Sequence, residues 1–230
     1  MKTYLGYSTD LQSIQQILEL HNIDAVDIGC GSGDFAAELA RLGARVTGIE
    51  PDPVQAKKNR KAPAVAGMTL LEAGAEGLPL ADASQDLLVF RFSLHHIPPQ
   101  LYPDVFREAA RVLRPGGQLY VMEPLAEGSS QHVMELFHDE TEVRKAAQEA
   151  LRTLTPPYFK HANSYRYDVL RRYDDFAAYV ERYDNMSYND YGEHQVDNSE
   201  VESRFLKYKD EDGGYLLSQP VKADLFKVLA

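Results

Sequence analysis

Three glycines on alternate positions, in the stretch VDIGCGSGDF at 26–35, constrain the fold of this chain more than any other feature. They are Gly29, Gly31 and Gly33, and they directly follow the short apolar run 23–28. Such a run is typical of a buried strand, and the residues after the glycines carry an apolar stripe at helical spacing. Because glycine tolerates tight turns and lets a ligand approach the main chain, the stretch predicts a strand, a ligand-binding turn and a helix.

The residues around this turn indicate which ligand it would hold. Dinucleotide-binding turns follow the pattern G-x-G-x-x-G, whereas Asp34 occupies the third glycine position here. A negative charge there disfavours a pyrophosphate and is tolerable beside an amino-acid head group. Glu50 ends the next apolar run, where a carboxylate can accept hydrogen bonds from both hydroxyls of a ribose. A ribose with an amino-acid head and no phosphate describes S-adenosylmethionine.

Strand and helix patterns alternate over the first half of the chain. Five runs have the character of buried strands, at 23–28, 44–49, 68–71, 86–92 and 118–122. Amphipathic helical stretches separate most of them, which predicts an α/β fold with a mostly parallel sheet covered by helices on both faces.

The pattern changes after residue 124. Residues 129–154 are charged and helical, 164–172 alternate like a strand, and 215–228 form a last extended segment. No repeat or linker divides the chain, so we expect one domain over 1–230, with a helical insertion near 126–160.

Charge and cysteine content narrow the partners and the compartment. The formal net charge is −11, and an acidic surface repels phosphate backbones, so we expect no nucleic-acid partner. A single cysteine, Cys30, excludes a disulfide framework. Neither a signal-peptide pattern nor an apolar run long enough to span a membrane is present, so we expect a cytoplasmic protein.

Five stretches between residues 26 and 124 carry a resemblance to a known family. They are VDIGCGSGDFAAELA (26–40), VTGIEPD (46–52), AEGLPLADASQDLLV (75–89), LHHI (94–97) and REAARVLRPGGQLYVMEP (107–124). In order and spacing they resemble the class I S-adenosylmethionine-dependent methyltransferases, especially the small-molecule branch called type 11. The resemblance implies a Rossmann-like, seven-stranded sheet with an antiparallel last strand. It also implies methyl transfer to a small-molecule acceptor that no motif identifies.

The same resemblance implies which residues hold the cofactor. Gly29, Gly31 and Gly33 would line its methionyl part, with Asp27 supporting the turn, and Glu50 would bind the ribose.

The adenine end departs from the family pattern. Pro51 would pack near the adenine, and Ala75 and Glu76 would lie along its edge. Family members often have an aspartate just before this Ala-Glu pair, where it accepts a hydrogen bond from the adenine amino group. Gly74 stands there in this chain, so adenine recognition would fall to backbone groups near Ala75 or to Glu76.

Four further residues are expected at the cofactor. Arg91 and Phe92 end the fourth predicted strand and would face both cofactor and acceptor. Tyr4 and Tyr7 precede the first helix, where family members often close a lid over the cofactor, and Tyr7 is the candidate for contact.

Methyl transfer makes modest demands on catalytic residues. The sulfonium is already electrophilic, so alignment of the reacting atoms supplies much of the rate, and a base is needed only for a protonated acceptor. His95 and His96 are weak candidates for that base, although capping the following turn accounts for them better. Glu123 would bind a cationic acceptor or cap a loop, and the sequence favours neither.

Two other groups of residues have a chemical and a structural interpretation. His132, His138, Asp139 and Glu140 lie on the insertion, but their spacing matches no strong metal motif, and a solvated helix face explains them better, so we expect no metal. Cys30 at a helix N-terminus would suit a nucleophile, yet a small residue in a tight turn is the simpler interpretation.

Eight of the fourteen tyrosines fall between residues 158 and 191. Aromatic faces can surround a sulfonium or a quaternary ammonium, and Tyr158, Tyr188 and Tyr191 are candidates for such a cage. The other tyrosines follow strand or helix spacing, which favours core packing.

Three other functions stay open at this point. A non-catalytic protein that binds S-adenosylmethionine would carry the same turn. An NAD-dependent oxidoreductase is disfavoured by Asp34, and an RNA-directed methyltransferase by the net charge of −11.

Overall fold

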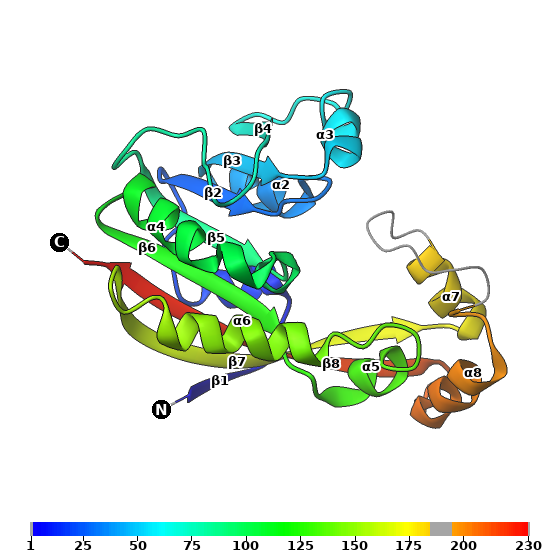
Figure 1. Cartoon of the computed structure of the whole chain (residues 1–230). Coiled ribbons are helices and arrows are strands. Elements are labelled where there is room, and N and C mark those ends of the chain that lie inside the picture. The colour runs from blue at the N-terminus through cyan, green and yellow to red at the C-terminus, as the bar shows by residue number, and fades with distance from the viewer. Residues whose placement is uncertain (1, 185–194, 230) are drawn as a thin grey trace.

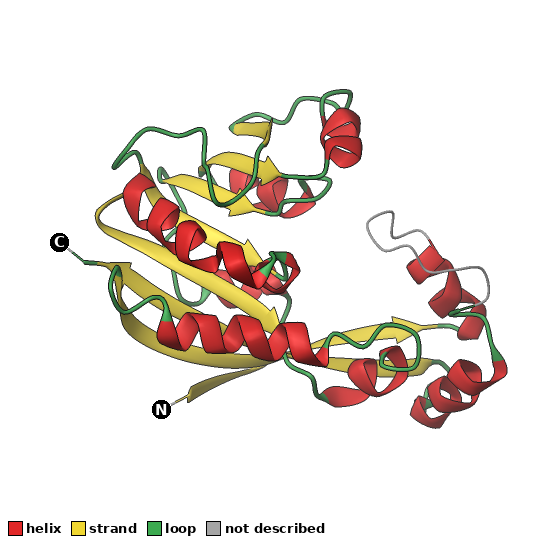
Figure 2. Cartoon of the chain, in the orientation of Figure 1, coloured by secondary structure: helices red, strands yellow, loops and turns green. Residues whose placement is uncertain are grey.

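The computed structural model describes residues 2–184 and 195–229, and its centre is one mixed sheet of eight strands (Figures 1 and 2). The strands are β1 Lys2–Tyr7, β2 Asp24–Ile28, β3 Arg45–Glu50, β4 Met68–Glu72, β5 Gln85–Arg91, β6 Leu113–Pro124, β7 Phe159–Tyr173 and β8 Tyr215–Val228. Their order is β1-β7-β8-β6-β5-β2-β3-β4. β8 is antiparallel to both neighbours, and the other described pairs are parallel. The predicted mostly parallel sheet with an antiparallel last strand is confirmed, but it has eight strands rather than the expected seven.

β1 is an additional strand that the sequence pattern does not predict. It pairs in parallel with β7 at the edge of the sheet. The stretch KTYLGY is short and does not alternate regularly between apolar and polar side chains. Tyr4 and Tyr7 are 57% and 72% exposed, and Gly6, with φ of +79°, falls where the register shifts. The usual strand signal is therefore missing from the sequence.

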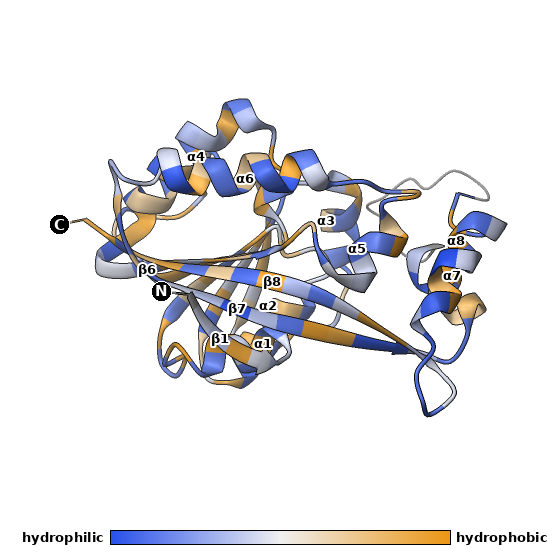
Figure 3. Ribbon diagram, turned by 90° about the horizontal axis from the view of Figure 1, so that it is seen from below, coloured by the Kyte–Doolittle hydropathy of each residue, from blue (hydrophilic) through white to orange (hydrophobic). Residues whose placement is uncertain are grey.

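Helices cover both faces of the sheet. The described α-helices are α1 Asp10–Gln15, α2 Asp34–Arg41, α3 Pro53–Asn59, α4 Tyr102–Val112, α5 Gly128–Met134, α6 Thr141–Thr153, α7 Phe176–Asp184 and α8 Ser199–Phe205. α4 and α6 lie on one face, and α1 and α2 on the other (Figure 3). Side chains of β2 alternate between these layers, since Val26 faces the first and Ala25 the second. The predicted helical insertion consists of α5 and α6. No helix in the described part of the chain is long and apolar enough to cross a membrane.

The longest strands, β7 and β8, extend beyond the rest of the sheet and carry α5, α7 and α8 at their far end (Figure 1). An outer aromatic cluster forms there from buried side chains: Val133, Met134, Tyr173, Tyr179, Tyr183, Val196, Val201, Phe205 and Leu217. Most of the described tyrosines between 158 and 191 are thus packed into core clusters. Tyr158 packs against the central core, whereas Tyr188 and Tyr191 lie outside the described residues.

Candidate active site

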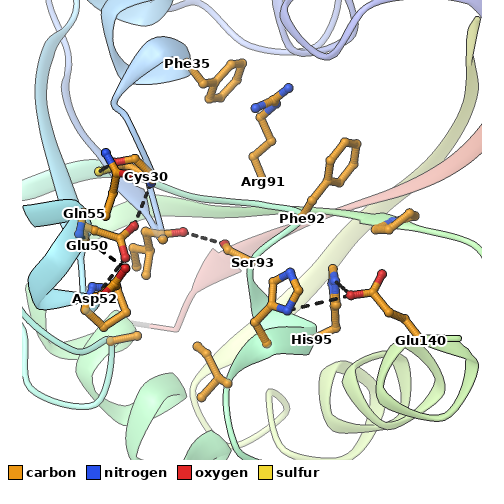
Figure 4. Close-up of a pocket in the computed structure, with 18 of the residues that line it drawn as sticks. Cys30, Phe35, Glu50, Asp52, Gln55, Arg91, Phe92, Ser93, His95 and Glu140 are labelled. Atoms are coloured by element: carbon orange, nitrogen blue, oxygen red, sulfur yellow. Dashed lines mark hydrogen bonds and ion pairs between the residues drawn. The ribbon is translucent and has the colours of Figure 1, made fainter. Parts of the chain in front are cut away.

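A cavity of about 780 Å³ opens beyond the carboxyl ends of β2, β3 and β5. β2 lies between β3 and β5, so the chain changes direction across the sheet at this point. In open parallel sheets, ligands bind where the strand order reverses. Glu50 lies on one side of the cavity, and His95 and Glu140 lie on the other (Figure 4).

The glycine turn forms one wall of this cavity. Gly29, Gly31 and Gly33 all have positive φ angles, +72°, +56° and +85°. A Cβ on Gly29 would lie 2.5 Å from Cβ of Ser93, and one on Gly33 would lie 3.0 Å from Leu70, whereas a Cβ on Gly31 would meet open space. Gly29 and Gly31 line the cavity, and Gly33 is among the described residues that do not. Two of these glycines permit close packing, and Gly31 keeps space open for a ligand.

Glu50 ties this turn to the end of β3. Its carboxylate accepts hydrogen bonds from the backbone N–H of Gly31 at 2.8 Å and of Asp52 at 2.9 Å. Asn59 donates to the Gly31 carbonyl at 2.8 Å and adds a third hydrogen bond that holds the glycine turn to its neighbours. No sequence signal points to Asn59, since it lies on α3 without a motif. Each Glu50 oxygen retains a second acceptor position, so the carboxylate can still bind hydroxyl groups in the cavity.

Asp27 lies behind the turn, outside the described lining of the cavity, with 2% of its surface exposed. Burial raises the pKa of Asp27 to about 7, and the nearby Arg91 charge offsets only part of that effect. Its Oδ2 atom has no hydrogen-bond partner in the described chain. The group therefore favours the protonated form far more in the folded than in the unfolded protein.

This shift predicts a pH-dependent stability difference for the Asp27→Asn variant. Between about pH 4 and 7 the unfolded chain releases the Asp27 proton while the folded protein retains it, so rising pH destabilises the wild type. The wild type should lose about 2–3 kcal/mol of unfolding free energy relative to the variant between pH 5 and 7, at about 1.4 kcal/mol per pH unit. Urea denaturation at both pH values measures it. A difference that is independent of pH would contradict the shift.

Arg91 is held in place at the base of the cavity. Its Nε donates to Oδ2 of Asp10 at 2.7 Å, and Tyr167 donates to the other oxygen of Asp10 at 2.9 Å. The guanidinium lies 5.1 Å from the ring centroid of Phe35 and 5.4 Å from that of Phe92. Arg91 and Phe92 both line the cavity, as the resemblance implies.

The residues expected beside the adenine all line the cavity, and the side chain of Glu76 lies against Gly74. Pro51, Ala75 and Glu76 line the cavity together with Gly74. A Cβ on Gly74 would lie 2.3 Å from Oε1 of Glu76. The carboxylate of the exposed Glu76 side chain therefore lies in the space that a side chain at position 74 would occupy, and the absence of a Cβ at Gly74 permits this position.

A cluster of histidines and carboxylates forms the opposite wall. Nδ1 of His95 contacts the fully buried carboxylate of Glu123. Oε1 of Glu140 lies 3.5 Å from Nε2 of His95, 3.9 Å from Nδ1 of His96 and 2.9 Å from Nε2 of His138. Burial lowers the pKa of His95, but Glu123 and Glu140 outweigh burial and raise it to about 9. Partial burial and the charge of His95 lower the pKa of His96, whose side chain is still 48% exposed.

The remaining candidate residues differ in whether they line the cavity. His95, His96, His138 and Glu140 line the cavity, whereas Glu123 lies behind His95. Tyr7 is exposed on β1 and is not among the described lining residues, as is also true of Tyr4, which donates to Asp168 at 2.7 Å.

Cys30, His132 and Asp139 have surroundings that argue against a catalytic or metal-binding role. Cys30 lines the cavity, but burial raises the pKa of its thiol, so it stays protonated and is a poor nucleophile. His132 contacts the Tyr208 hydroxyl, and Asp139 accepts from the backbone of Thr141 at 3.0 Å, so neither joins the histidine cluster.

Three further arginines in the lining of the cavity are not indicated by any sequence motif. They are Arg144 on α6, Arg171 on β7 and Arg182 on α7. Arg144 donates to Glu140 at 2.6 Å. Within residues 2–184 and 195–229, no carboxylate pairs with Arg171 or Arg182. Burial and the Arg182 charge lower the pKa of Arg171.

Comparison with known proteins adds family information to this geometry. Residues 26–121 match a family model described as a methyltransferase domain. A sterol 4-C-methyltransferase of Caenorhabditis elegans is 32% identical over 115 residues, covering 48% of this chain and 34% of that protein. The 27-O-demethylrifamycin SV methyltransferase of Amycolatopsis mediterranei is 40% identical over 99 residues, covering 41% and 36%. The aligned part spans about a third of the length of these relatives.

Solved structures share the fold over nearly the whole chain. A Bacillus halodurans protein described as a methyltransferase superposes with a TM-score of 0.60 at 18% identity, covering 96% of this chain and 99% of that one. The structure reported for the conversion of a disulfide bond into a thioacetal group during echinomycin biosynthesis gives a TM-score of 0.63 at 16% identity, covering 97% and 82%.

Proposed function

The chain belongs to the class I S-adenosylmethionine-dependent methyltransferases, and from this premise we propose that it transfers a methyl group from S-adenosylmethionine to a small-molecule acceptor. The observation that carries the proposal is the glycine turn bound by Glu50 at the point where the strand order reverses. A cavity of about 780 Å³ has room for a nucleoside cofactor and a small second molecule.

The residues present fit this cofactor along its whole length. The open space beside Gly31 would take the methionyl part, and the free acceptor positions of Glu50 would take the ribose hydroxyls. Glu76, whose carboxylate replaces a side chain at Gly74, would accept from the adenine amino group. Asp34 also lines the cavity, where its charge opposes a pyrophosphate and disfavours NAD.

The chain's own residues supply positioning rather than a catalytic group. The bound cofactor supplies an electrophilic methyl group on a sulfonium. Glu50 and the turn hold the donor, and the walls formed by α5, α6 and α7 exclude water and orient the acceptor. Holding two reactants in line contributes roughly 7–11 kcal/mol in favourable cases.

Calorimetry and a turnover assay test the proposal on the full chain. We expect S-adenosylhomocysteine to bind with one-to-one stoichiometry and S-adenosylmethionine to be consumed with at least one acceptor of a metabolite panel. Absence of binding at millimolar ligand would overturn the proposal. Binding without turnover of any acceptor would favour the non-catalytic alternative.

The acceptor side of the cavity supports a narrower acceptor class. Arg171 and Arg182 line it without a carboxylate partner in the described chain, although the protein has a net charge of −11. Arg171 is half-buried beside the exposed Arg182, and two neighbouring cations favour a ligand that supplies the opposite charge. The proposed acceptor therefore carries a carboxylate or phosphate group beside the methylated atom. The sterol and rifamycin relatives support a small-molecule acceptor in general.

The Arg171→Ala variant tests this class. Loss of one charge-assisted hydrogen bond costs about 1.5–3 kcal/mol, so kcat/KM for an anionic acceptor should fall roughly 10–100-fold. The affinity for S-adenosylhomocysteine should stay unchanged. Arg172→Ala is the matched control, because the adjacent Arg172 pairs with Asp210 and is not among the described lining residues. Preference of the wild type for neutral esters over the matching acids would contradict the assignment.

A further inference from the structure

The histidine and carboxylate cluster opposite the glycine turn has the composition of a metal site. One ring nitrogen each of His95 and His96 and one oxygen of Glu140 lie within 4.8 Å of one another. All three residues line the cavity, and they come from two separate segments, the turn after β5 and the start of α6. Two imidazoles and one carboxylate form a ligand set that binds Zn²⁺ in enzymes.

The separations suit a small cation. Oε1 of Glu140 lies 3.5 Å from Nε2 of His95 and 3.9 Å from Nδ1 of His96. Bonds of roughly 2.0–2.1 Å to a tetrahedral zinc ion place neighbouring ligand atoms about 3.3 Å apart. Small side-chain movements would therefore bring the three atoms to bonding distance.

Outer contacts already fix the orientation of these side chains. Nδ1 of His95 faces Glu123, which also accepts from the backbone N–H of Leu94 at 3.0 Å, so the Nε2 atom is directed toward Glu140. Metal-binding histidines typically have a carboxylate on the second ring nitrogen in this way. Glu140 is held in turn by Arg144 at 2.6 Å and by His138 at 2.9 Å.

The charge of the cluster is also suitable. The cluster contains two buried carboxylates, Glu123 and Glu140, and one guanidinium, that of Arg144, which pairs with Glu140. A divalent cation in place of the proton on His95 would keep these buried carboxylates compensated. Buried carboxylates need such compensation, because an uncompensated charge in the interior is costly.

We propose that His95, His96 and Glu140 form a binding site for a divalent first-row cation, Zn²⁺ in the first instance. Three protein ligands leave a fourth position open, and the placement of the cluster in the cavity directs it toward the acceptor.

The catalytic consequence rests on the proposed function, whereas cation binding does not. An acceptor hydroxyl at the open position would lose its proton to water more readily. The oxygen then bonds to the methyl carbon as the carbon–sulfur bond breaks, and the electron pair of that bond stays on sulfur. The site would thus activate the acceptor in a cavity where His95 is engaged by carboxylates on both ring nitrogens.

Titration calorimetry of the chelator-treated full chain with Zn²⁺ tests the site. We expect one equivalent to bind, and Co²⁺ to give the visible absorption of a four- or five-coordinate centre. His96→Ala should weaken Zn²⁺ binding by at least the roughly 10–100-fold that loss of an outer partner costs. His161→Ala is the matched control, because the His161 side chain is 50% exposed, against 48% for His96, and it pairs with Asp224 on β8.

A second variant guards against misfolding, and a second readout separates the two proposals. Glu123→Gln keeps the shape of the buried side chain and should weaken Zn²⁺ binding roughly 10–100-fold through His95. S-adenosylhomocysteine affinity is measured on the same samples and should not change in His96→Ala. No Zn²⁺ binding to the wild type, or equal binding to His96→Ala, would overturn the site. Zn²⁺ binding without S-adenosylhomocysteine binding would instead overturn the proposed function.

Discussion

The Glu50→Ala variant is expected to lose at least 100-fold in affinity for S-adenosylhomocysteine. Glu50 would accept hydrogen bonds from the ribose, and each bond to a charged group contributes about 1.5–3 kcal/mol. Two such bonds amount to about 3–6 kcal/mol, and each 1.4 kcal/mol is tenfold in affinity. The variant also frees the backbone N–H groups of Gly31 and Asp52, which loosens the turn that would contact the methionyl group. Calorimetry measures the change directly.

Glu72→Ala provides the control for this variant. Glu72 pairs with Glu50 in the register of β3 and β4, but its side chain is 42% exposed and contacts Arg60 at 2.7 Å. It lies outside the described lining of the cavity, so its loss should leave affinity unchanged. Retention of wild-type affinity by Glu50→Ala, with thermal unfolding unchanged, would remove Glu50 from the cofactor site.

Gly29→Ala is expected to destabilise the fold far more than Gly31→Ala, although both replace a glycine with positive φ. At Gly29 the new Cβ would lie 2.5 Å from Cβ of Ser93, so the turn after β5 must move. Overpacking costs about 1–3 kcal/mol and left-handed strain a further 1–2 kcal/mol. At Gly31 the Cβ would meet open space, so only the strain of about 1–2 kcal/mol applies.

Gly29→Ala and Gly31→Ala should also differ in how their effects on stability and on S-adenosylhomocysteine affinity compare. Gly31→Ala should fold, with a loss of unfolding free energy no greater than the strain of about 1–2 kcal/mol. Its methyl group should occupy space that the cofactor needs, so affinity for S-adenosylhomocysteine should fall. Equal destabilisation by both variants would show that packing against Ser93 does not limit position 29. Unchanged affinity in Gly31→Ala would place the cofactor away from the turn.

The donor half of the candidate site could be predicted from sequence because its signals are local. A strand, a glycine turn, a helix and an acidic residue at the next strand end follow one another within 26–50. Each neighbour in this series restricts the backbone of the next, and β2 and β3 pair directly. The sheet order beyond them followed from the family resemblance rather than from the residues.

The acceptor half could not be predicted, because tertiary packing assembles it. Arg171 and Arg182 come from β7 and α7, where no motif marks them. His138 and Glu140 are adjacent in sequence to other polar residues, and a solvated helix face was the better interpretation. Only the packing of α6 near the turn after β5 brings Glu140 to His95. β1 is not predicted for a different reason, since KTYLGY lacks the regular alternation that marks a strand.

Gly74 and Glu76 have a consequence for how relatives of this chain are recognised. In a sequence comparison with family members that have an aspartate at this position, Gly74 looks like the loss of an acidic group. In the molecule, a carboxylate from two residues further along fills that volume, and the missing side chain is what admits it. A sequence pattern that demands an acid at position 74 would therefore miss a chain that, like this one, brings a carboxylate there from position 76.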